Sequence, residues 1–229
     1  MLSAKEIKKK AGQEAAALIS NGMTIGLGTG STVFFLIEEL GRRIKQGLSF
    51  RAVPTSVQTV ELASAMGMQL VDLNEVDQLE ITIDGADEID PHGRLIKGGG
   101  GALLQEKIVA AASKEMVVIA DESKLVETLG RFPLPVEVIP FGYKHVIDSI
   151  KKQTYCGQLI LREKNGKPFI TDHQHYIIDC HFGSIGDVTA LDAILRSIVG
   201  IVETGLFFGL ASGALIGRGD GSIERINFR

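Results

Sequence analysis

The sequence predicts an α/β protein with a mostly parallel sheet, followed by a smaller α+β part. Short apolar strand candidates alternate with helix candidates through the first 131 residues, the pattern of a parallel sheet covered by helices. Pro133 and Pro135 end this alternation, because proline breaks helices and suits a crossing between domains. With 229 residues, 45% of them hydrophobic, the chain can build a sizeable core in one large or two small domains.

The first part begins with a helix that starts at the capping-box pattern Ser3-Ala4-Lys5-Glu6 and is expected to end at Asn21-Gly22. Strands and helices then follow in turn. We expect strands near 23–27, near 70, over 79–83 and over 116–120, with a further strand that ends at Thr55, and helices over 33–46, 56–66 and 102–112. Ligands of such a sheet bind at the carboxyl ends of its strands, so the loops there are the first place to look for a site.

The second part has the order strand, helix, strand, strand, helix, strand, which is that of a ferredoxin-like unit. We expect strands at 136–139, 158–163, 169–181 and 201–207, helices at 143–152 and 188–198, and a turn at Asn165-Gly166. The residues from Ala214 to Gly217 are expected to return to the first sheet. The predicted domains are therefore residues 1–131 with 208–229, and residues 132–207.

The composition argues against several classes of partner. With 24 basic and 28 acidic residues, the net charge of -4 lacks the positive footprint of nucleic-acid binders. Apolar runs stay well short of the roughly 20 residues of a membrane span, and the N-terminus has the pattern of a charged amphipathic helix rather than a signal peptide. Cys156 and Cys180 lack metal-ligand spacing and fit a reducing compartment. We therefore expect a cytoplasmic protein with neither a nucleic-acid nor a membrane partner.

The acidic segment 84–90, Asp-Gly-Ala-Asp-Glu-Ile-Asp, directly follows the strand candidate 79–83. Carboxylates crowded at the end of a strand repel one another, so a site that moves protons explains them better than a structural role. Asp84 and Asp87 are the candidate acid-base groups, whereas Glu88 and Asp90 are more readily explained as solvated charges. An irregular Mg²⁺ site is the alternative, although Ala86 occupies the third ligand position of an EF-hand.

The segment 26–32, Gly-Leu-Gly-Thr-Gly-Ser-Thr, lies where a strand gives way to a helix. Its backbone N–H groups and hydroxyls could converge on an anion at the helix N-terminus. It lacks both the third glycine of the dinucleotide fingerprint and the lysine of the P-loop, so it indicates a phosphate or sugar hydroxyl rather than a nucleotide. The alternative is a tight turn with Ser31 or Thr32 as the helix N-cap.

The second glycine loop, Lys97-Gly98-Gly99-Gly100-Gly101, precedes the helix expected over 102–112. Four glycines cost conformational entropy unless the backbone approaches something closely or needs positive φ, and a flexible surface loop is the alternative. If the buried stripe of the helix consists of Leu104, Ile108 and Ala111, Glu106 lies on another face, where it could meet a ligand.

Lysines supply the positive charge that an anionic ligand needs. Lys97 could stabilise a developing oxyanion, and Lys124 follows an apolar strand, from which it could reach the carboxyl edge of the sheet. Lys8, Lys9 and Lys10 form the polar face of a helix, and only one of them is expected to reach a ligand.

These segments occur together in a fixed order and spacing. They are Gly28-Thr29-Gly30-Ser31-Thr32, Thr55-Ser56, Asp84-Gly85-Ala86-Asp87-Glu88-Ile89, Lys97-Gly98-Gly99-Gly100, Glu106-Lys107, Asp121 with Ser123-Lys124, and Phe132-Pro133-Leu134-Pro135-Val136-Glu137. In this combination the chain resembles the type A ribose-5-phosphate isomerases over nearly its whole length. The resemblance implies a Rossmann-like domain with a smaller ferredoxin-like one, assembled as a homodimer or homotetramer.

The resemblance also implies an activity: interconversion of D-ribose 5-phosphate and D-ribulose 5-phosphate in the non-oxidative pentose phosphate pathway, without metal or organic cofactor. It makes Glu106 the general base of an enediolate mechanism and Asp84 the group for ring opening. Asp87 and Lys97 would handle hydroxyl protons and stabilise the oxyanion. The substrate-binding set that it implies is Lys8, Thr29, Gly30, Ser31, Thr32, Gly85, Ala86, Gly98, Gly99, Gly100 and Lys124.

Two other functions are weighed against this one. A glucosamine-6-phosphate deaminase or a sugar-phosphate lactonase would share the glycine loops, but would not be expected to combine the acidic segment with Lys97 and Glu106. A non-catalytic sugar-phosphate sensor should carry a helix-turn-helix, and this N-terminus has room for one helix before the first strand.

Overall fold

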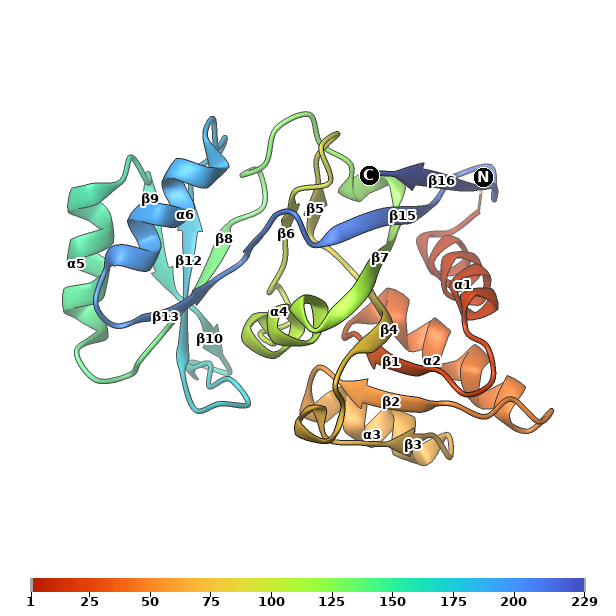
Figure 1. Ribbon diagram of the computed structural model, residues 1–229. Coiled ribbons are helices and arrows are strands. Elements are labelled where there is room, and N and C mark those ends of the chain that lie inside the picture. The colour runs from red at the N-terminus through yellow and green to blue at the C-terminus, as the bar shows by residue number, and fades with distance from the viewer. Residues whose placement is uncertain (1, 229) are drawn as a thin grey trace. The chain divides into compact units, whose positions relative to one another are not determined.

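The computed structural model describes residues 2–228, which form two compact units (Figure 1). Within the described residues, unit 1 consists of residues 2–86, 105–124 and 209–228, and unit 2 of residues 87–104 and 125–208. Among the described residues, no helix is both long and apolar enough to cross a membrane.

Unit 1 is built on a seven-stranded sheet within the described residues, in the order β16-β15-β7-β4-β1-β2-β3. The strands are β1 (Thr24–Leu27), β2 (Arg51–Pro54), β3 (Gln69–Leu70), β4 (Leu79–Asp84), β7 (Ser113–Asp121), β15 (Ala211–Gly217) and β16 (Ile223–Asn227). Neighbouring strands are parallel except β15 and β16. The chain places β2 and β3 on one side of β1 and β4 on the other, so the loops after β1 and β4 meet at a topological switch point.

Helices surround this sheet (Figure 1). They are α1 (Ala4–Ala15), α2 (Ser31–Ile44), α3 (Val57–Ala65) and α4 (Leu103–Ala111), with 3₁₀ turns η1 (Ala16–Leu18), η2 (Leu73–Glu75) and η3 (Glu122–Lys124). The predicted capping box of α1 is confirmed, because the Ser3 and Glu6 side chains each accept a hydrogen bond from the other residue's backbone N–H.

The core of unit 1 follows the alternation of side chains along its strands. Ile25 and Leu27 of β1 belong to the cluster that includes Leu36 of α2, whereas Gly26 between them faces α4. A Cβ at Gly26 would lie 2.5 Å from a methyl group of Val109, so a glycine at this position lets α4 approach the sheet.

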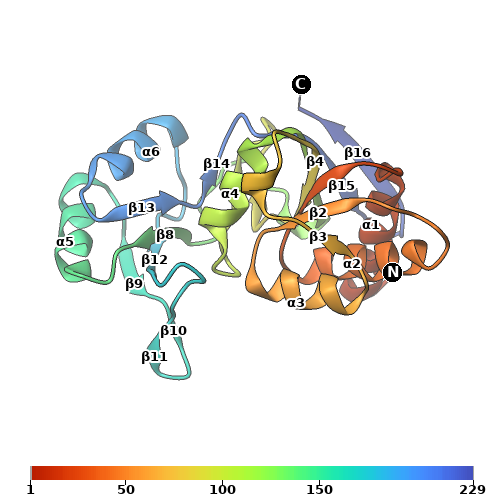
Figure 2. The same ribbon diagram turned by 60° about the horizontal axis from the view of Figure 1, so that its bottom comes forward.

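Unit 2 contains an antiparallel sheet in the order β13-β8-β12-β9 within the described residues. Its strands are β8 (Leu134–Val138), β9 (Gln158–Leu161), β12 (Tyr176–His181) and β13 (Ile201–Thr204), and its helices are α5 (Tyr143–Gln153) and α6 (Val188–Ser197). The chain order β8-α5-β9-β12-α6-β13 is the predicted one. Both helices pack with Val136 and Ile178 in one apolar cluster, on the same face of the sheet (Figure 2).

Several short strands of unit 2 were not predicted. They are β5 (Glu88–Ile89), β6 (Leu95–Ile96) and the hairpin strands β10 (Glu163–Lys164) and β11 (Lys167–Pro168). β5 and β6 form a three-stranded sheet with β14 (Leu206–Phe207), which is the end of the strand predicted over 201–207 and is separate from β13. The hairpin turns at Asn165 and Gly166, whose φ angles of 56° and 71° confirm the predicted turn.

The expectation of one long strand over 169–181 is wrong, because a turn interrupts it before β12. Glu137 on β8 is buried, and its Oε1 accepts hydrogen bonds from the Thr171 hydroxyl at 2.9 Å and from the ring of His175 at 3.0 Å. The turn between these two residues also gives Gln174 a positive φ of 65°. These polar contacts replace a strand ladder there.

The two units differ from the predicted domains at residues 87–104, 125–131 and 208, which lie in unit 2. Residues 87–104 contain β5 and β6, and β6 pairs with β14 of the same unit. The following loop joins them because the Val126 N–H donates to the Ile89 carbonyl at 2.9 Å. The predicted domain boundaries stay a prediction.

Candidate active site

Asp84 ends β4 at the switch point of unit 1 and is fully buried. Its Oδ1 accepts hydrogen bonds from the backbone N–H groups of Thr29 at 3.0 Å and Gly85 at 2.7 Å. A Cβ at Gly28 would lie 2.2 Å from the same oxygen. The loop after β1 therefore contains glycine at this position because the carboxylate of Asp84 occupies the space a side chain would need.

The hydroxyl of Thr29 points into a cluster of hydroxyl groups rather than into open space. It lies 2.8 Å from the Thr55 hydroxyl, 2.7 Å from that of Ser56 and 3.1 Å from that of Thr59. Thr59 in turn donates to the Gly28 carbonyl at 2.8 Å. This cluster fixes the loop that holds Asp84, and Thr59 is a member that the sequence analysis missed. The signal was its position three residues after Ser56, the N-cap of α3.

The N-terminus of α2 lies directly after this loop. Its N-cap is Gly30, with a φ of 109° and no side-chain cap, so the alternative of Ser31 or Thr32 as the N-cap is wrong. Both residues are instead in the first turn of α2, where backbone N–H groups lack carbonyl partners within the helix. The Lys8 ammonium donates to the Ser31 hydroxyl at 3.0 Å. A lysine, a hydroxyl and a helix N-terminus thus converge, as an anion site requires.

Glu106 lies on the buried face of α4, with only 4% of the residue exposed. The expected buried stripe of Leu104, Ile108 and Ala111 is wrong: Ile108 and Ala111 are exposed and Leu104 is half-buried. The buried residues of α4 are Leu103, Glu106, Val109 and Ala110. The carboxylate therefore occupies a position that apolar side chains usually fill in an amphipathic helix.

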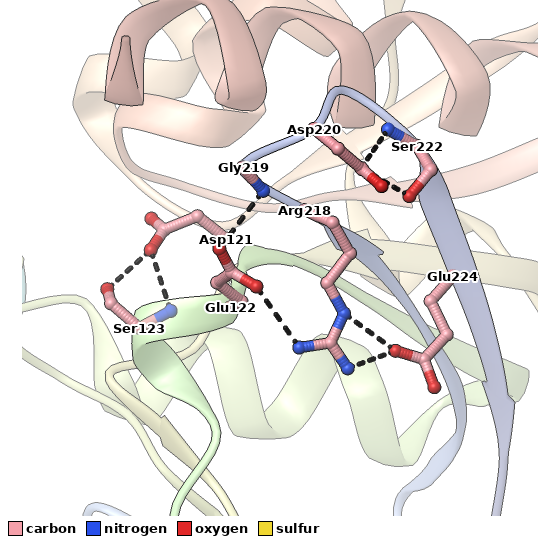
Figure 3. A network of polar contacts seen from close by, with 8 residues as sticks. All are labelled: Asp121, Glu122, Ser123, Arg218, Gly219, Asp220, Ser222 and Glu224. Carbon is pink, nitrogen blue, oxygen red and sulfur yellow. Dashed lines mark hydrogen bonds and ion pairs between the residues drawn. The ribbon is translucent and has the colours of Figure 1, made fainter. Parts of the chain in front are cut away.

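Lys124 is half-buried in η3 at the carboxyl end of β7. Figure 3 shows how this turn is held: the Asp121 carboxylate accepts hydrogen bonds from the backbone N–H and the hydroxyl of Ser123, and Glu122 binds the guanidinium of Arg218. The Glu122 carboxylate also accepts from the Gly219 N–H at 3.0 Å. These contacts tie the turn that carries Lys124 to the end of β15.

Of the remaining predicted residues, Gly85 and Ala86 lie in unit 1, directly after β4, whereas Asp87, Lys97 and the glycine loop lie in unit 2. Asp87 is a half-buried residue, and its carboxylate Oδ2 accepts a hydrogen bond from the Gly99 N–H at 2.7 Å. Lys97 is buried, with its Nζ 5.5 Å from the centre of the Phe207 ring. Gly98, Gly99 and Gly100 follow it, and Gly98 has a φ of 104°. Unit 2 thus brings Asp87 and the glycine loop together.

Glu88 and Asp90 are not solvated charges as expected, because both are buried. Glu88 accepts hydrogen bonds from the N–H groups of Gly130 at 2.7 Å and Phe132 at 2.6 Å. Asp90 accepts from the N–H groups of His92 and Arg94 and forms an ion pair with the Arg94 guanidinium. Their burial is compensated by these partners, so both residues hold loops in place.

No group of three or more His, Cys, Asp and Glu residues within 2–228 is arranged to hold a metal ion. The two cysteines are free thiols. The hydrogen bond between them lowers the pKa of Cys156, and the same contact together with burial raises the pKa of Cys180.

Comparison with known proteins gives one consistent family. The family model of ribose 5-phosphate isomerase A (phosphoriboisomerase A) matches residues 51–221. Ribose-5-phosphate isomerase A of Bacillus cereus (strain ATCC 10987) is 55% identical over 219 residues, which cover 95% of this chain and 99% of the relative.

Solved structures agree. Ribose 5-phosphate isomerase from Plasmodium falciparum superposes with a TM-score of 0.94 at 38% identity, covering 97% of this chain and 98% of that one. A D-ribose-5-phosphate isomerase in complex with phospho-erythronic acid has a TM-score of 0.94 at 37% identity, covering 99% and 100% of the two chains.

Proposed function

The chain belongs to the ribose 5-phosphate isomerase A family, and from this premise we propose how it interconverts D-ribose 5-phosphate and D-ribulose 5-phosphate: Glu106 carries a proton between C2 and C1. The reaction is a step of the non-oxidative pentose phosphate pathway. The observation that carries the proposal is the burial of Glu106 on α4.

The chemistry requires one base that acts at two neighbouring carbons. Removal of the C2 proton of the open-chain aldose leaves an enediolate, and return of a proton to C1 gives the ketose. A carboxylate suits both steps, since it takes the proton and then gives it back. Burial shields Glu106 from bulk water. A base that moves a carbon-bound proton beside a carbonyl needs such shielding.

Three further groups complete the proposed machinery. Asp84 is the proposed group for opening of the sugar ring. Two backbone N–H groups fix the direction of its carboxylate, which supports this role. Asp87 handles a hydroxyl proton, and the Lys97 ammonium stabilises the negative charge on the enediolate oxygen. Asp84 and Asp87 are three residues apart in the sequence, so the chain keeps their Cα atoms within roughly 11 Å.

The phosphate group is proposed to bind where unit 1 gathers positive charge. Lys8, the Ser31 hydroxyl and the N-terminus of α2 supply it, with Lys124 as a further cation. An acidic protein can bind an anion in this way through a local cluster. The other members of the proposed substrate-binding set offer backbone or hydroxyl groups: Thr29, Gly30, Thr32, Gly85, Ala86, Gly98, Gly99 and Gly100. Thr29 contributes its N–H to Asp84, since its hydroxyl is engaged in the hydroxyl cluster.

We also propose that the enzyme works in the cytoplasm as a homodimer or homotetramer. Free thiols fit a reducing compartment. Phe141 and Val199 of unit 2 are 93% and 94% exposed, and an interface would cover such side chains. Sedimentation of the purified protein checks the assembly.

The proposed function is tested by following the conversion of D-ribose 5-phosphate in excess EDTA, with Glu106→Gln beside the parent. We expect the parent to be active and the variant to lose about 100- to 10,000-fold in kcat with its fold intact. Glu127→Gln changes an exposed carboxylate and is the matched control. A parent that binds the sugar phosphate without converting it would favour a sensor, and normal turnover in Glu106→Gln would remove Glu106 from the role of base.

A further inference from the structure

Arg162, directly after β9 in unit 2, has a guanidinium that links two parts of that unit. Its Nε and Nη2 donate to the two carboxylate oxygens of Asp179 on β12, at 2.9 and 2.5 Å. Its Nη1 donates to the carbonyl oxygens of Gly98 at 2.7 Å and Gly99 at 3.2 Å. The Arg162 and Asp179 side chains are only 14% and 19% exposed.

The sheet register explains how these residues meet. Ile178 and Cys180 point into the apolar cluster beneath α5 and α6, so Asp179 between them points to the opposite face. A Cβ at Gly98 would lie 3.2 Å from the Cβ of Pro135, which is the β8 partner of Asp179. The glycine loop therefore lies along the face of the sheet that carries Asp179.

One peptide group of the loop is bound at both ends. The carbonyl of Gly98 accepts from Arg162, and the N–H of the same peptide, that of Gly99, donates to the Asp87 carboxylate at 2.7 Å. Asp179, Arg162, the Gly98–Gly99 peptide and Asp87 thus form a continuous chain of hydrogen bonds. In such a chain each hydrogen bond polarises the next, so the guanidinium makes the Gly99 N–H a stronger donor to the Asp87 carboxylate.

The loop needs this support because glycine leaves its backbone free. Gly98 and Gly101 have φ angles of 104° and 85°, which few other residues adopt. Phe169 packs on Gly101, where a Cβ would lie 2.4 Å from its ring, and the Arg162 guanidinium lies 5.9 Å from the centre of the same ring. The guanidinium and the ring hold the loop at both of its ends.

We propose that Arg162 and Asp179 are positioning residues for the isomerase reaction, acting through the Gly98–Gly99 peptide to orient the carboxylate of Asp87. This inference rests on the proposed function, in which Asp87 handles a hydroxyl proton. Arg162 need not touch the substrate. Arginine is required because lysine cannot bind a carboxylate through two parallel N–H groups and two carbonyls at once.

The alternative explanation is that the Arg162–Asp179 ion pair only stabilises unit 2. Arg196 provides the comparison, since it donates to Asp192 and to Glu203 at 2.6 Å each, within the same unit. Arg196→Met removes a similar ion pair and is the matched control for Arg162→Met.

The test is a double-mutant cycle on kcat with Arg162→Met, Asp87→Asn and the two combined. We expect Arg162→Met to lower kcat by about 10- to 100-fold. The combined variant should be no slower than Asp87→Asn alone, because both changes disable the same chain of hydrogen bonds. Arg196→Met should keep near-parent kcat. Losses that multiply in the combined variant, or a normal kcat in Arg162→Met or in Asp87→Asn, would overturn the proposal.

Amide hydrogen exchange gives a second readout that does not depend on turnover. Arg162→Met should speed exchange at the Gly99 N–H by about 10-fold or more while the amides of β8 and β12 stay protected. Unchanged exchange at Gly99 would show that Arg162 does not hold the Gly98–Gly99 peptide. If Arg162→Met does not fold, Asp179→Asn serves in the same two measurements, with the same outcomes expected. The parent and Glu106→Gln assays separate failure of this inference from failure of the proposed function.

Discussion

At the scale of single residues, Gly28 shows how closely the site is built. The Asp84 carboxylate occupies the space beside the Cα of Gly28, and the backbone N–H of the next residue, Thr29, donates to that carboxylate. This N–H group and that of Gly85 hold one oxygen of the carboxylate in a fixed direction. The glycine therefore serves the orientation of an acid rather than the flexibility of a loop.

Gly28→Ala should accordingly lower kcat/KM by about 100-fold or more. The added methyl would lie 2.2 Å from Oδ1 and 2.6 Å from the Cα of Asp84, so the carboxylate and the strand must both shift. Steady-state kinetics check this expectation. Gly186→Ala is the control, because a Cβ there meets nothing within 4 Å. Full activity in Gly28→Ala would show that the position of Asp84 does not matter.

The sequence was informative about which residues to propose for the site and less so about where they lie. Asp84, Glu106 and Lys97 could be selected from their order and spacing. The burial of Glu106 could not, because a carboxylate among apolar positions violates the amphipathic pattern that predicts helix faces. Such violations occur where function outweighs stability, so a helix whose apolar stripe is irregular deserves a second interpretation.

At the scale of elements, α2 carries a buried carboxylate that pairs with two arginines of the same helix. Glu39 accepts hydrogen bonds from Arg42 at 2.6 Å and from Arg43 at 2.9 Å, and Arg43 also reaches the Ala16 carbonyl at 2.9 Å. The hydrogen bond with Arg42, helped by Arg43, lowers the pKa of Glu39 from 4.5 to about 2. The ionised form is therefore favoured in the folded state.

This lowered pKa makes stability depend on acid. The contribution of Glu39 is complete above its unfolded pKa of 4.5 and is lost as pH falls toward about 2. Glu39→Gln should lower the free energy of unfolding by about 1 to 3 kcal/mol at pH 7, less than the full shift implies because Arg42 is 56% exposed.

Urea unfolding between pH 7 and pH 3 measures this effect. The difference between parent and Glu39→Gln should shrink as the pH drops below about 4.5. Glu38→Gln alters the exposed neighbour of Glu39 and should show no such trend. A difference that stays constant over the whole range would contradict the assignment.

The hairpin of β5 and β6 depends on Glu88 in a similar way. Glu88→Ala would leave the buried N–H groups of Gly130 and Phe132 without their acceptor, so the free energy of unfolding should fall by about 2 to 4 kcal/mol. Chemical denaturation measures the change. Glu163→Ala, at an exposed position of β10, should cost far less, and equal losses would argue against a special role for Glu88.

This hairpin could not be predicted from the sequence. Its strands are two residues long, too short for a period-2 pattern, and its acids looked like solvated charges. Long elements such as α1 and β4 were predicted because many residues repeat the same pattern. The capping box and the Asn165-Gly166 turn were predicted because their residue types have specific backbone requirements.

At the scale of the whole molecule, the alternation of strands and helices was enough to predict the parallel sheet and the ferredoxin-like order after Pro135. That residues 87–104 lie in unit 2 could not be predicted from this alternation. Those residues pair with β14, which lies more than a hundred positions along the chain, and local periodicity carries no information about such a partner. Each unit has its own apolar cluster, as two separately packed bodies require.

In the proposed reaction, the step on which the others depend is removal of the C2 proton by the Glu106 carboxylate. The most direct measurement uses D-ribose 5-phosphate that carries deuterium at C2 and follows the loss of that label in parent and Glu106→Gln enzyme. We expect the parent to remove the C2 deuterium as the ketose forms. In the variant, removal of the deuterium and formation of the ketose should both be slower by about 100-fold or more. Loss of the C2 deuterium at the parent's rate in Glu106→Gln would place the base elsewhere.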